Sequence, residues 1–257
     1  MSEKSVKTGK SANGASKLDG DIEVRKLNDA NKETKIRLNK FLAERMGWSR
    51  READELIRAG KVKIGEKKAK IGERIDKNNE VWYNGKIIPF KVQFLYLAMN
   101  KPAGYVCSRS SQGGAPTVYK LLPEKYKNLK TVGRLDMESC GLILLTNDGD
   151  FAYKMTHPGF AKQKVYIVEL ADTLPPIHQQ MITDFGINLK DGKSKMMLEK
   201  MDDERRKWRV MISEGRNRQI RRTFGALGHT VVFLQRIQFG HYGLGGLMEG
   251  EFEEVEQ

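Results

Sequence analysis

The chain has 257 residues, enough for one large domain or two modest ones, and 39% of them are hydrophobic. Its lysines and arginines exceed its acids by 13, which favours a polyanionic partner, RNA or DNA before an anionic membrane. No apolar run approaches the ~20 residues of a membrane span, and the N-terminus lacks the apolar core of an export signal. Cys107 and Cys140 form no metal-ligand cluster, so we expect reduced thiols in a cytoplasmic protein.

Composition divides the chain into a polar tail and two folded parts. Residues 1–35 hold almost no large apolar side chains and cannot offset their ordering entropy by burial, which predicts a disordered tail. A small first domain is expected over residues 36–84, followed by a junction over residues 84–91. A larger second domain is expected over residues 92–250.

Two short helices and several short strands are expected in the first domain. Ser49-Arg50-Arg51-Glu52 reads as a capping box at the start of the second helix, and Gly60 reads as its C′ residue. Between residues 37 and 80, thirteen bases face eight acids, a net of +5. Several bases cluster at the ends of the second helix, where they could bind phosphates, although a solvated helix pair fits the charge equally well. The basic residues expected to contact RNA are Arg37, Lys40, Arg50, Arg51, Arg58 and Lys61.

The same part of the chain resembles a known RNA-binding module. The similar segments are Arg37-Leu38-Asn39-Lys40-Phe41-Leu42, Ser49-Arg50-Arg51-Glu52-Ala53, and Ile57 through Gly60-Lys61-Val62 with the strand that follows. They are similar to the S-four module, which is named after a small-subunit ribosomal protein. The resemblance implies a compact fold that binds structured RNA through the basic face of its helices.

The second domain is predicted to be rich in strands. The strands expected from apolar runs and alternation cover residues 94–99, 142–145, 164–170, 208–212 and 230–234. The expected helices cover residues 118–122 after a Thr117 cap, 150–156, 176–185 and 217–226. Strands outnumber helices and several neighbours could pair as hairpins, so the expected fold is α+β with a mixed, mainly antiparallel sheet.

A turn in the middle of the second domain carries a candidate catalytic acid. Gly133 and Gly141 frame a polar turn, and the apolar run that follows is too short for a helix, which predicts a strand buried on both faces. The turn holds the carboxylate of Asp136 two residues after Arg134, and a nearby guanidinium favours the charged form of an acid. Such an acid could act as a nucleophile, although most aspartates in turns only bind backbone amides.

A second motif near the C-terminus is strongly basic. Residues 205–222 contain eight bases and one acid. Asn217 is the expected N-cap of a helix that carries Arg218, Arg221 and Arg222 on adjacent turns. A strand-to-helix junction of this kind suits phosphate oxygens, because backbone amides and guanidinium groups converge there. An exposed basic helix is the alternative, but the bases crowd the turn rather than spread along the helix.

Three motifs of the second domain, in this order along the chain, are similar to those of a known enzyme family. The similar segments are Gly133-Arg134-Leu135-Asp136 with Ser139, Gly141 and Thr146-Asn147-Asp148-Gly149, then Lys164-Val165-Tyr166, then Glu214-Gly215-Arg216-Asn217-Arg218-Gln219-Ile220-Arg221-Arg222. Together they resemble the signature of the RsuA-type pseudouridine synthases, in which an S-four module usually comes first. Gly114-Ala115-Pro116-Thr117-Val118 and Ser139-Cys140-Gly141 are most similar to the RluB branch, which modifies large-subunit ribosomal RNA.

The resemblance implies a reaction and a role for several residues. Uridine would be isomerised within ribosomal RNA by breaking its N-glycosidic bond, rotating the base and rejoining it through carbon 5. Asp136 would be the nucleophile or the proton-abstracting carboxylate, Tyr166 would stack on the flipped uracil, and Arg221 would pair with Asp136. The residues expected to contact RNA in this domain are Arg134, Arg216, Arg218 and Arg222, of which the last three compete with Arg221 for the carboxylate.

The implied mechanism requires no metal and no organic cofactor. The implied partner is ribosomal RNA or an assembling ribosomal subunit, and the chain is expected to act as a monomer away from membranes. Two other interpretations remain open. An S-four RNA-binding factor that has lost activity need not keep Asp136, whereas a DNA-base glycosylase would also flip its target but would release free base.

Overall fold

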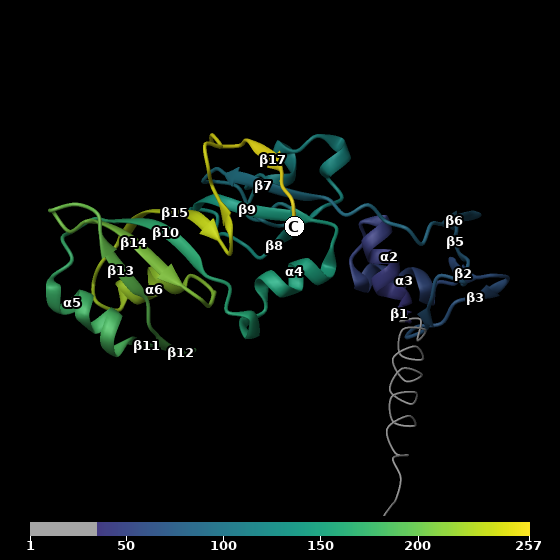
Figure 1. Ribbon diagram of the computed structural model, residues 1–257, viewed down its shortest axis with the longest axis horizontal. Coiled ribbons are helices and arrows are strands. Elements are labelled where there is room, and N and C mark those ends of the chain that lie inside the picture. Colours follow the sequence, from purple (N-terminus) through teal and green to yellow (C-terminus); the bar gives the residue numbers. More distant parts are fainter. Residues whose placement is uncertain (1–34) are drawn as a thin grey trace, which may run out of the picture.

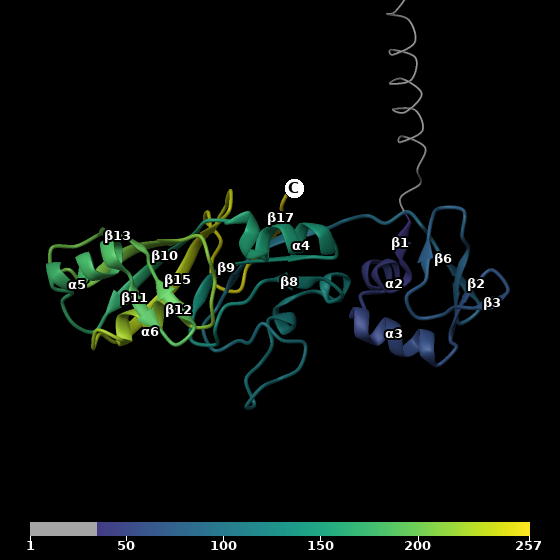
Figure 2. The same cartoon turned by 90° about the horizontal axis from the view of Figure 1, so that it is seen from below.

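The computed structural model describes residues 35–257, so the tail expected over residues 1–35 lies, except for Lys35, outside the described residues. Residues 35–88 form a small N-terminal unit and residues 96–257 form a larger C-terminal unit. Figures 1 and 2 place the N-terminal unit (purple and blue) beside the end of the C-terminal unit that carries β8 and α4. Within residues 35–257, no helix combines the length and apolarity needed to cross a bilayer.

The N-terminal unit packs two helices against short strands. Its elements are β1 (Ile36–Arg37), α2 (Leu38–Met46), α3 (Arg50–Arg58), β2 (Val62–Ile64), β3 (Lys67–Lys68), β4 (Arg74–Ile75), β5 (Val81–Tyr83) and β6 (Lys86–Ile88). The strands form one sheet in the order β3-β2-β5-β6 and a small pair, β1 with β4. Leu38, Phe41 and Leu42 from α2 meet Ala53 and Ile57 from α3 in a core of their own.

Local sequence signals explain how α3 begins and ends. The Ser49 hydroxyl accepts a hydrogen bond from the Glu52 amide, and the Glu52 carboxylate accepts one from the Ser49 amide, so the predicted capping box is confirmed. Gly60 follows the helix with φ of +68°, as a C′ glycine does. The strand β6 pairs with β5 and lies within the segment 84–91 that was expected to be a junction.

The C-terminal unit is built on one nine-stranded sheet. Its strands are β7 (Tyr96–Lys101), β8 (Lys130–Val132), β9 (Cys140–Thr146), β10 (Lys164–Leu170), β13 (Met197–Lys200), β14 (Lys207–Ile212), β15 (Val231–Phe239), β16 (Tyr242–Gly243) and β17 (Phe252–Glu254). The order is β13-β14-β10-β15-β9-β7-β17, with β8 on β9 and β16 on β15, and only β15 and β9 run parallel. A separate hairpin joins β11 (Ile187–Leu189) and β12 (Gly192–Ser194). The predicted α+β fold with a mixed, mainly antiparallel sheet is confirmed.

Short helices connect these strands. They are the 3-10 turns Val118–Leu121, Glu124–Tyr126 and Pro158–Phe160, the helices α4 (Gly149–Thr156), α5 (Pro176–Gln180) and α6 (Gln219–Gly225), and a π-helical turn, Met181–Phe185, that continues α5. Three expectations need correction. Thr117 precedes its helix without a side-chain capping bond. The last helix begins at Gln219 after Arg218, which has φ of +47°, so Asn217 is not its N-cap. The strand expected to end at residue 234 continues to Phe239.

The central strand β9 is buried along its whole length, as the apolar run predicted. Its alternate side chains serve two cores on opposite faces of the sheet. Ile143 and Leu145 join the larger core with Trp208 and Phe224, whereas Leu144 joins a smaller core beside α4. A strand that is buried on both faces is fixed in the fold, and it also fixes the segment before it. For β9, that segment is the turn with the candidate acid.

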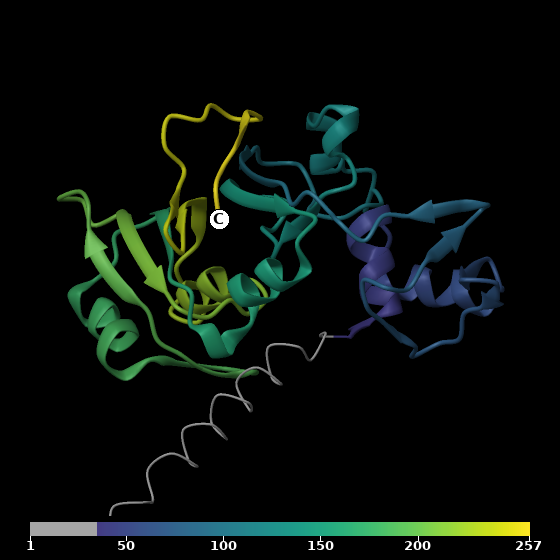
Figure 3. The same ribbon diagram turned by 45° about the vertical axis from the view of Figure 1, so that its right-hand side comes forward.

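The sheet divides into two halves between β9 and β15. These strands pair over only two positions, Gln235 with Cys140 and Arg236 with Gly141. At that point a Cβ atom on Gly141 would lie 2.3 Å from the Arg236 carbonyl oxygen, so only glycine allows the approach. Figure 3 shows the yellow C-terminal segment crossing from the half with β15 to the half with β7, where β17 pairs. A cavity opens where the two halves diverge.

Candidate active site

Asp136 lies on a tight turn between β8 and β9. Its carbonyl oxygen accepts a hydrogen bond from the Ser139 amide at 3.1 Å, and Gly133 enters the turn with φ of +71°, a conformation that glycine adopts without strain. The Asp136 side chain is partly exposed. Among the contacts within residues 35–257, its carboxylate has no hydrogen bond and no ion pair, so it is free to meet a ligand.

A buried lysine holds this turn in place. Lys101, at the end of β7, is fully buried, and its ammonium donates to the carbonyl oxygens of Ser139 at 2.6 Å, Pro102 at 2.8 Å and Met137 at 3.4 Å. Burial lowers the pKa of Lys101. Two of the three carbonyl groups belong to the turn itself, so the lysine fixes the backbone that carries Asp136.

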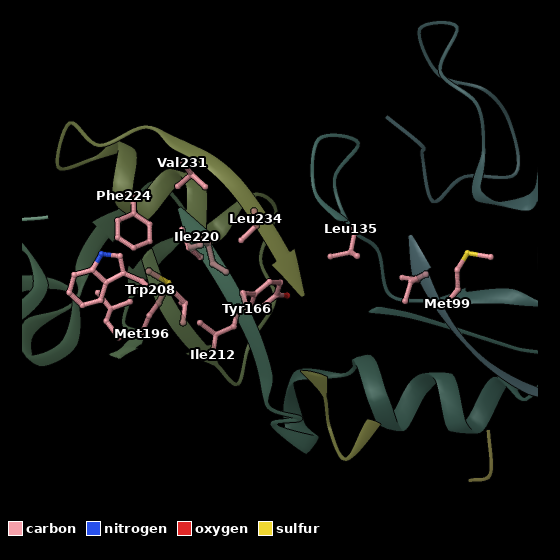
Figure 4. Close-up of a cluster of buried hydrophobic side chains, with 14 of the residues drawn as sticks. Met99, Leu135, Tyr166, Met196, Trp208, Ile212, Ile220, Phe224, Val231 and Leu234 are labelled. Atoms are coloured by element: carbon pink, nitrogen blue, oxygen red, sulfur yellow. The ribbon is translucent and has the colours of Figure 1, made fainter. Parts of the chain in front are cut away.

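Tyr166 lies in β10, opposite Val210 of β14 and Arg236 of β15. Its ring is buried at the edge of the larger core. Figure 4 shows its hydroxyl directed toward the loop that carries Leu135, the neighbour of Asp136 in sequence. Tyr166 and Asp136 line the same pocket, which has a volume of about 240 Å³.

This pocket is lined by apolar and charged side chains, with exposed or half-buried charged residues at its mouth and buried ones at its floor. Its apolar walls are Leu135, Tyr166, Ile212, Ile220, Leu234 and Phe239. Its charged side chains are Arg134, Asp136, Lys164, Arg216, Arg218 and Arg236. It is smaller than the ~300–1,000 Å³ pockets that hold drug-sized ligands. A small pocket with apolar walls and several cations suits one planar ring that is attached to a polyanionic chain.

Arg218 and Arg221 approach the Asp136 turn from α6. Arg218 donates to the Glu138 carboxylate at 2.8 Å, and this bond raises the pKa of Arg218 and lowers that of Glu138. Arg221 donates to the Ser139 hydroxyl at 3.3 Å and to the Glu138 carbonyl at 3.4 Å, and burial lowers its pKa. The expected ion pair between Arg221 and Asp136 is not among the contacts of residues 35–257. In this structure Arg221 contacts the turn, not the carboxylate.

Arg216 and Arg222 are both bound by an acid on the β11–β12 hairpin. Asp191 pairs with Arg222 at 2.7 Å and with Arg216 at 3.1 Å, and the hydrogen bond from Arg222 lowers the pKa of Asp191. Arg216 also pairs with Glu214 at 3.1 Å. Arg216 lines the pocket, whereas Arg222 and Arg221 do not. Of the arginines in the segment Glu214 to Arg222, therefore, Arg216 and Arg218 share the pocket with Asp136, as does Arg134 of the Asp136 motif.

The basic residues expected to bind RNA in the N-terminal unit lie outside this pocket. Five of them are exposed: Arg37, Arg50, Arg51, Arg58 and Lys61. The sixth, Lys40, pairs with Asp150 of α4 at 2.7 Å and with Glu44 at 3.8 Å. Lys40 therefore joins the two units in this structure.

Sequence reasoning did not find two cations of the site. Lys101 and Arg236 are both buried in strands of the sheet. In the sequence, each is a single charged residue at the end of a strand pattern or within one, which by itself does not indicate a buried site. Their partners are backbone carbonyl groups that only the tertiary fold brings near. Within residues 35–257, no group of three His, Cys, Asp or Glu side chains could hold a metal ion.

Comparison with known proteins explains this combination of fold and pocket. Residues 95–226 match the family model described as RNA pseudouridylate synthase, and residues 36–81 match the S4 domain, the S-four module predicted above. The ribosomal large subunit pseudouridine synthase B of Bacillus subtilis (strain 168) is 33% identical over 85% of this chain and 91% of its own length. The ribosomal small subunit pseudouridine synthase A of Pasteurella multocida (strain Pm70) is 35% identical over 86% of this chain and 96% of its own.

A solved structure is similar over the same extent. A protein described as "Crystal structure of pseudouridylate synthase" superposes with a TM-score of 0.62 at 34% identity, covering 86% of this chain and 96% of that one. The family match, the two relatives and this solved structure together identify the chain as an RNA-modifying isomerase. The chain belongs to the RNA pseudouridylate synthase family and carries an S4 domain in front of the synthase domain. The resemblance to the RsuA-type enzymes is confirmed.

Proposed function

We propose that the chain converts specific uridines to pseudouridine in ribosomal RNA, of the large subunit in particular, with Asp136 as the reacting carboxylate. The supporting observation is that Asp136, Tyr166 and two motif arginines, which are far apart in sequence, line one pocket of about 240 Å³. The large-subunit assignment draws support from the segments that resemble the RluB branch, because the 33% identity to synthase B of Bacillus subtilis is matched by the 35% identity to synthase A of Pasteurella multocida.

The free carboxylate of Asp136 suits cleavage of a glycosidic bond. Such cleavage leaves positive charge on the sugar, and a carboxylate next to the sugar either stabilises that charge, bonds to carbon 1′ or removes a proton from carbon 2′. One carboxylate is enough, because no water is added and the base stays in the site. Lys101, Ser139 and Arg221 hold the turn, so the acid is already in position when RNA binds.

The base must leave the RNA stack to reach Asp136. Flipping costs a few kcal/mol, and stacking on an aromatic ring offsets part of this cost. Tyr166 offers such a ring inside the pocket, and the exposed Arg134 at the mouth is placed to contact the displaced strand. Arg216 and Arg218, also at the mouth, are placed to contact phosphates once RNA competes with Asp191 and Glu138 for them.

The N-terminal unit would bind structured RNA next to the modified nucleotide. Its exposed bases at both ends of α3 support phosphate contacts over an extended surface. The proposed partner is ribosomal RNA, either free or within an assembling subunit.

The first experiment tests activity and the role of Asp136 together. Wild-type protein and Asp136→Ala are incubated with ribosomal RNA, and pseudouridine is mapped by carbodiimide treatment and primer extension. We expect new stops with the wild type and none with Asp136→Ala, whose RNA affinity should stay within a few fold because phosphate contacts supply most of it.

Three outcomes would contradict this proposal. Unchanged RNA with the wild type would favour an RNA-binding factor without activity. Equal losses of binding and turnover in Asp136→Ala would mean that Asp136 has a structural role. Release of free base with an abasic site would indicate a glycosylase, because isomerisation leaves the mass of the strand unchanged.

A further inference from the structure

Two cations on the floor of the pocket have no assigned role. Arg236 is 2% exposed and Lys164 is 9% exposed, and neither makes an ion pair within residues 35–257. Both face the Phe239 ring, whose centroid lies 4.8 Å from the Arg236 guanidinium carbon and 5.1 Å from the Lys164 ammonium. Burying two like charges without a directly paired anion is costly. Such an arrangement is expected where an anion arrives during the working cycle.

A β-bulge brings these cations next to Tyr166. The register between β10 and β15 shifts between Val165 and Tyr166, so that Lys164 lies opposite Phe239 while Tyr166 lies opposite Arg236. Without the extra residue, Tyr166 would face position 237 and Arg236 would pair one position further along β10. Bulges next to active sites commonly re-aim a side chain in this way.

Both cations keep hydrogen-bond donors for a ligand. Arg236 uses Nε to bind the Leu142 carbonyl at 2.7 Å, but its Nη2 is buried without a partner. The Lys164 ammonium donates to the carbonyl oxygens of Lys162 at 3.1 Å and Glu214 at 3.4 Å, which leaves one of its three N–H groups. Burial lowers the pKa of Lys164, the charge of Arg236 acts in the same direction, and the charge of Glu214 opposes them in part.

These donors are better placed for the base than for a phosphate. The apolar side chains of Ile212 and Leu234 line the same pocket, and burying a phosphate among them would be costly. The exposed arginines at the mouth already suit phosphates. A flipped uracil, by contrast, would present its two carbonyl oxygens to the floor while its ring contacts the apolar walls and Tyr166.

We propose that Arg236 and Lys164 are catalytic residues that stabilise the uracil anion formed when the glycosidic bond breaks; this inference rests on the proposed function. When the bond between carbon 1′ and N1 breaks, the electron pair stays on N1 and spreads to O2 and O4, and the sugar becomes an oxocarbenium ion next to Asp136. The base rotates, carbon 5 bonds to carbon 1′ and loses its proton, and N1 gains one. The two cations hold the negative charge throughout the rotation.

The test compares leaving groups of different basicity. Large-subunit ribosomal RNA is transcribed with uridine or with 5-fluorouridine. Carbon 5 of the fluorinated base has no proton to lose, so the assay follows loss of the target nucleoside, which reports cleavage of the glycosidic bond in both substrates, in single turnover by nuclease digestion and mass spectrometry. Fluorine withdraws electrons, so the departing base needs less help to carry its charge. We expect Arg236→Gln to slow the uridine reaction by about 10²–10³-fold, as loss of an oxyanion donor does, and the fluorouridine reaction at least tenfold less. Lys164→Gln should show the same asymmetry, and Arg236→Lys should recover part of the rate.

Controls separate this role from a structural one. Arg209→Gln removes an arginine of the neighbouring strand that pairs with Glu199 outside the pocket, and it should leave both rates unchanged. Thermal unfolding identifies any variant that fails to fold. If Arg236→Gln does not fold, Lys164→Gln provides the comparison between the uridine and fluorouridine rates. Equal losses on both substrates, no loss, or no recovery by Arg236→Lys would overturn the inference alone. A wild type that leaves uridine unchanged would overturn the proposed function and this inference with it.

Discussion

At the scale of single residues, the side chains that fix the turn of Asp136 are as necessary to the site as the Asp136 carboxylate. Lys101 brings a buried ammonium to three backbone carbonyls, two of them on the Asp136 turn. A methionine at this position would fill much of the same space but would leave buried acceptors without a donor. Loss of these hydrogen bonds is offset in part because a charge no longer has to be buried, so the net cost is about 1–3 kcal/mol. The turn would then be free to shift, and a displacement of about 1 Å at a reacting group can cost 10²-fold in rate.

We therefore predict that Lys101→Met lowers the free energy of unfolding by about 1–3 kcal/mol and lowers kcat at least tenfold, while RNA affinity stays within a few fold. Denaturant unfolding, single-turnover kinetics and filter binding measure the three quantities. Lys120→Met, which removes an exposed lysine and the same charge, is the matched control. A Lys101→Met protein with the kcat of this control would show that the ammonium does not position the turn.

The resemblance to a known family predicted Asp136 and Tyr166 as members of one site, and both side chains line the same pocket. It did not identify the partner of Arg221, which contacts Ser139 and the Glu138 backbone in the folded chain. Several arginines of one motif have similar local sequence, so their distances to a distant turn depend on the fold and not on spacing. Arg236 escaped notice for the same reason, since a bulge determines where it points.

At the scale of elements, the sheet depends on the close contact between β9 and β15. Gly141 has φ of +100°, and a Cβ atom there would lie 2.3 Å from the Arg236 carbonyl oxygen and 2.7 Å from its nitrogen. We predict that Gly141→Ala destabilises the protein by about 2–4 kcal/mol through backbone strain and overpacking, and that it lowers turnover because the pocket opens at this contact. Thermal and denaturant unfolding check the first effect and pseudouridine formation the second.

Gly225 provides the matched control for that substitution. It ends α6 without a positive φ, and a Cβ atom added there would have no neighbouring atom within 4 Å. Gly225→Ala should change stability by less than about 1 kcal/mol, since alanine is the better helix former. Equal stability of the two alanine variants would mean that β9 and β15 can separate without cost.

A histidine pair links α5 to the loop after α6 and should respond to pH. The rings of His178 and His229 lie 2.8 Å apart between Nδ1 and Nε2, and burial, then the charge of His178, lowers the pKa of His229 below its ordinary value of 6.5. On acidification, His229 therefore binds a proton at a higher pH in the unfolded chain than in the folded chain. The free energy of unfolding accordingly falls as pH decreases from 6.5 toward the lowered pKa.

We predict that His229→Gln reduces this loss of stability on acidification. Thermal unfolding between about pH 7 and pH 5, the range of histidine titration, gives the slope for the wild type and the variant. His241→Gln, at a histidine outside the pair, is the control. The same slope in the wild type and His229→Gln would show that another group causes the pH dependence.

The elements themselves were largely predictable, and their limits were less so. Apolar alternation gave residues 164–170 as a strand with the observed bounds, and the capping box fixed the start of α3. The strand β15 runs five residues beyond its expected end, because the polar residues Gln235, Arg236 and Gln238 interrupt the apolar pattern. Two of these residues pair with β9 at the contact between the two halves of the sheet. The apolar pattern therefore failed to predict the end of the strand next to the active site.

At the scale of the whole molecule, the placement of the two units could not be read from sequence. The ammonium of Lys130, in β8, donates to the Trp48 carbonyl at 2.6 Å and to the Ala43 carbonyl at 3.4 Å, at the C-terminal end of α2. A cation is favourable there because helix carbonyls point outward with partial negative charge. Lys40 and Asp150 form a second contact between α2 and α4. Backbone carbonyls have no sequence signature, so such contacts are not predictable from residue types.

Fixed placement should help the enzyme because both units then meet one RNA in a set geometry. Binding by the second unit becomes intramolecular, and its benefit depends on how closely the orientation matches the RNA. We predict that Lys130→Met raises KM for structured ribosomal RNA several fold and leaves kcat unchanged, because the pocket is intact. Lys127→Met removes the same charge three residues away, where the lysine pairs locally with Glu124, and it should keep the wild-type KM. If both variants raised KM equally, the effect would come from lost positive charge, and the contact between α2 and β8 would have no part in orienting the S4 domain on RNA.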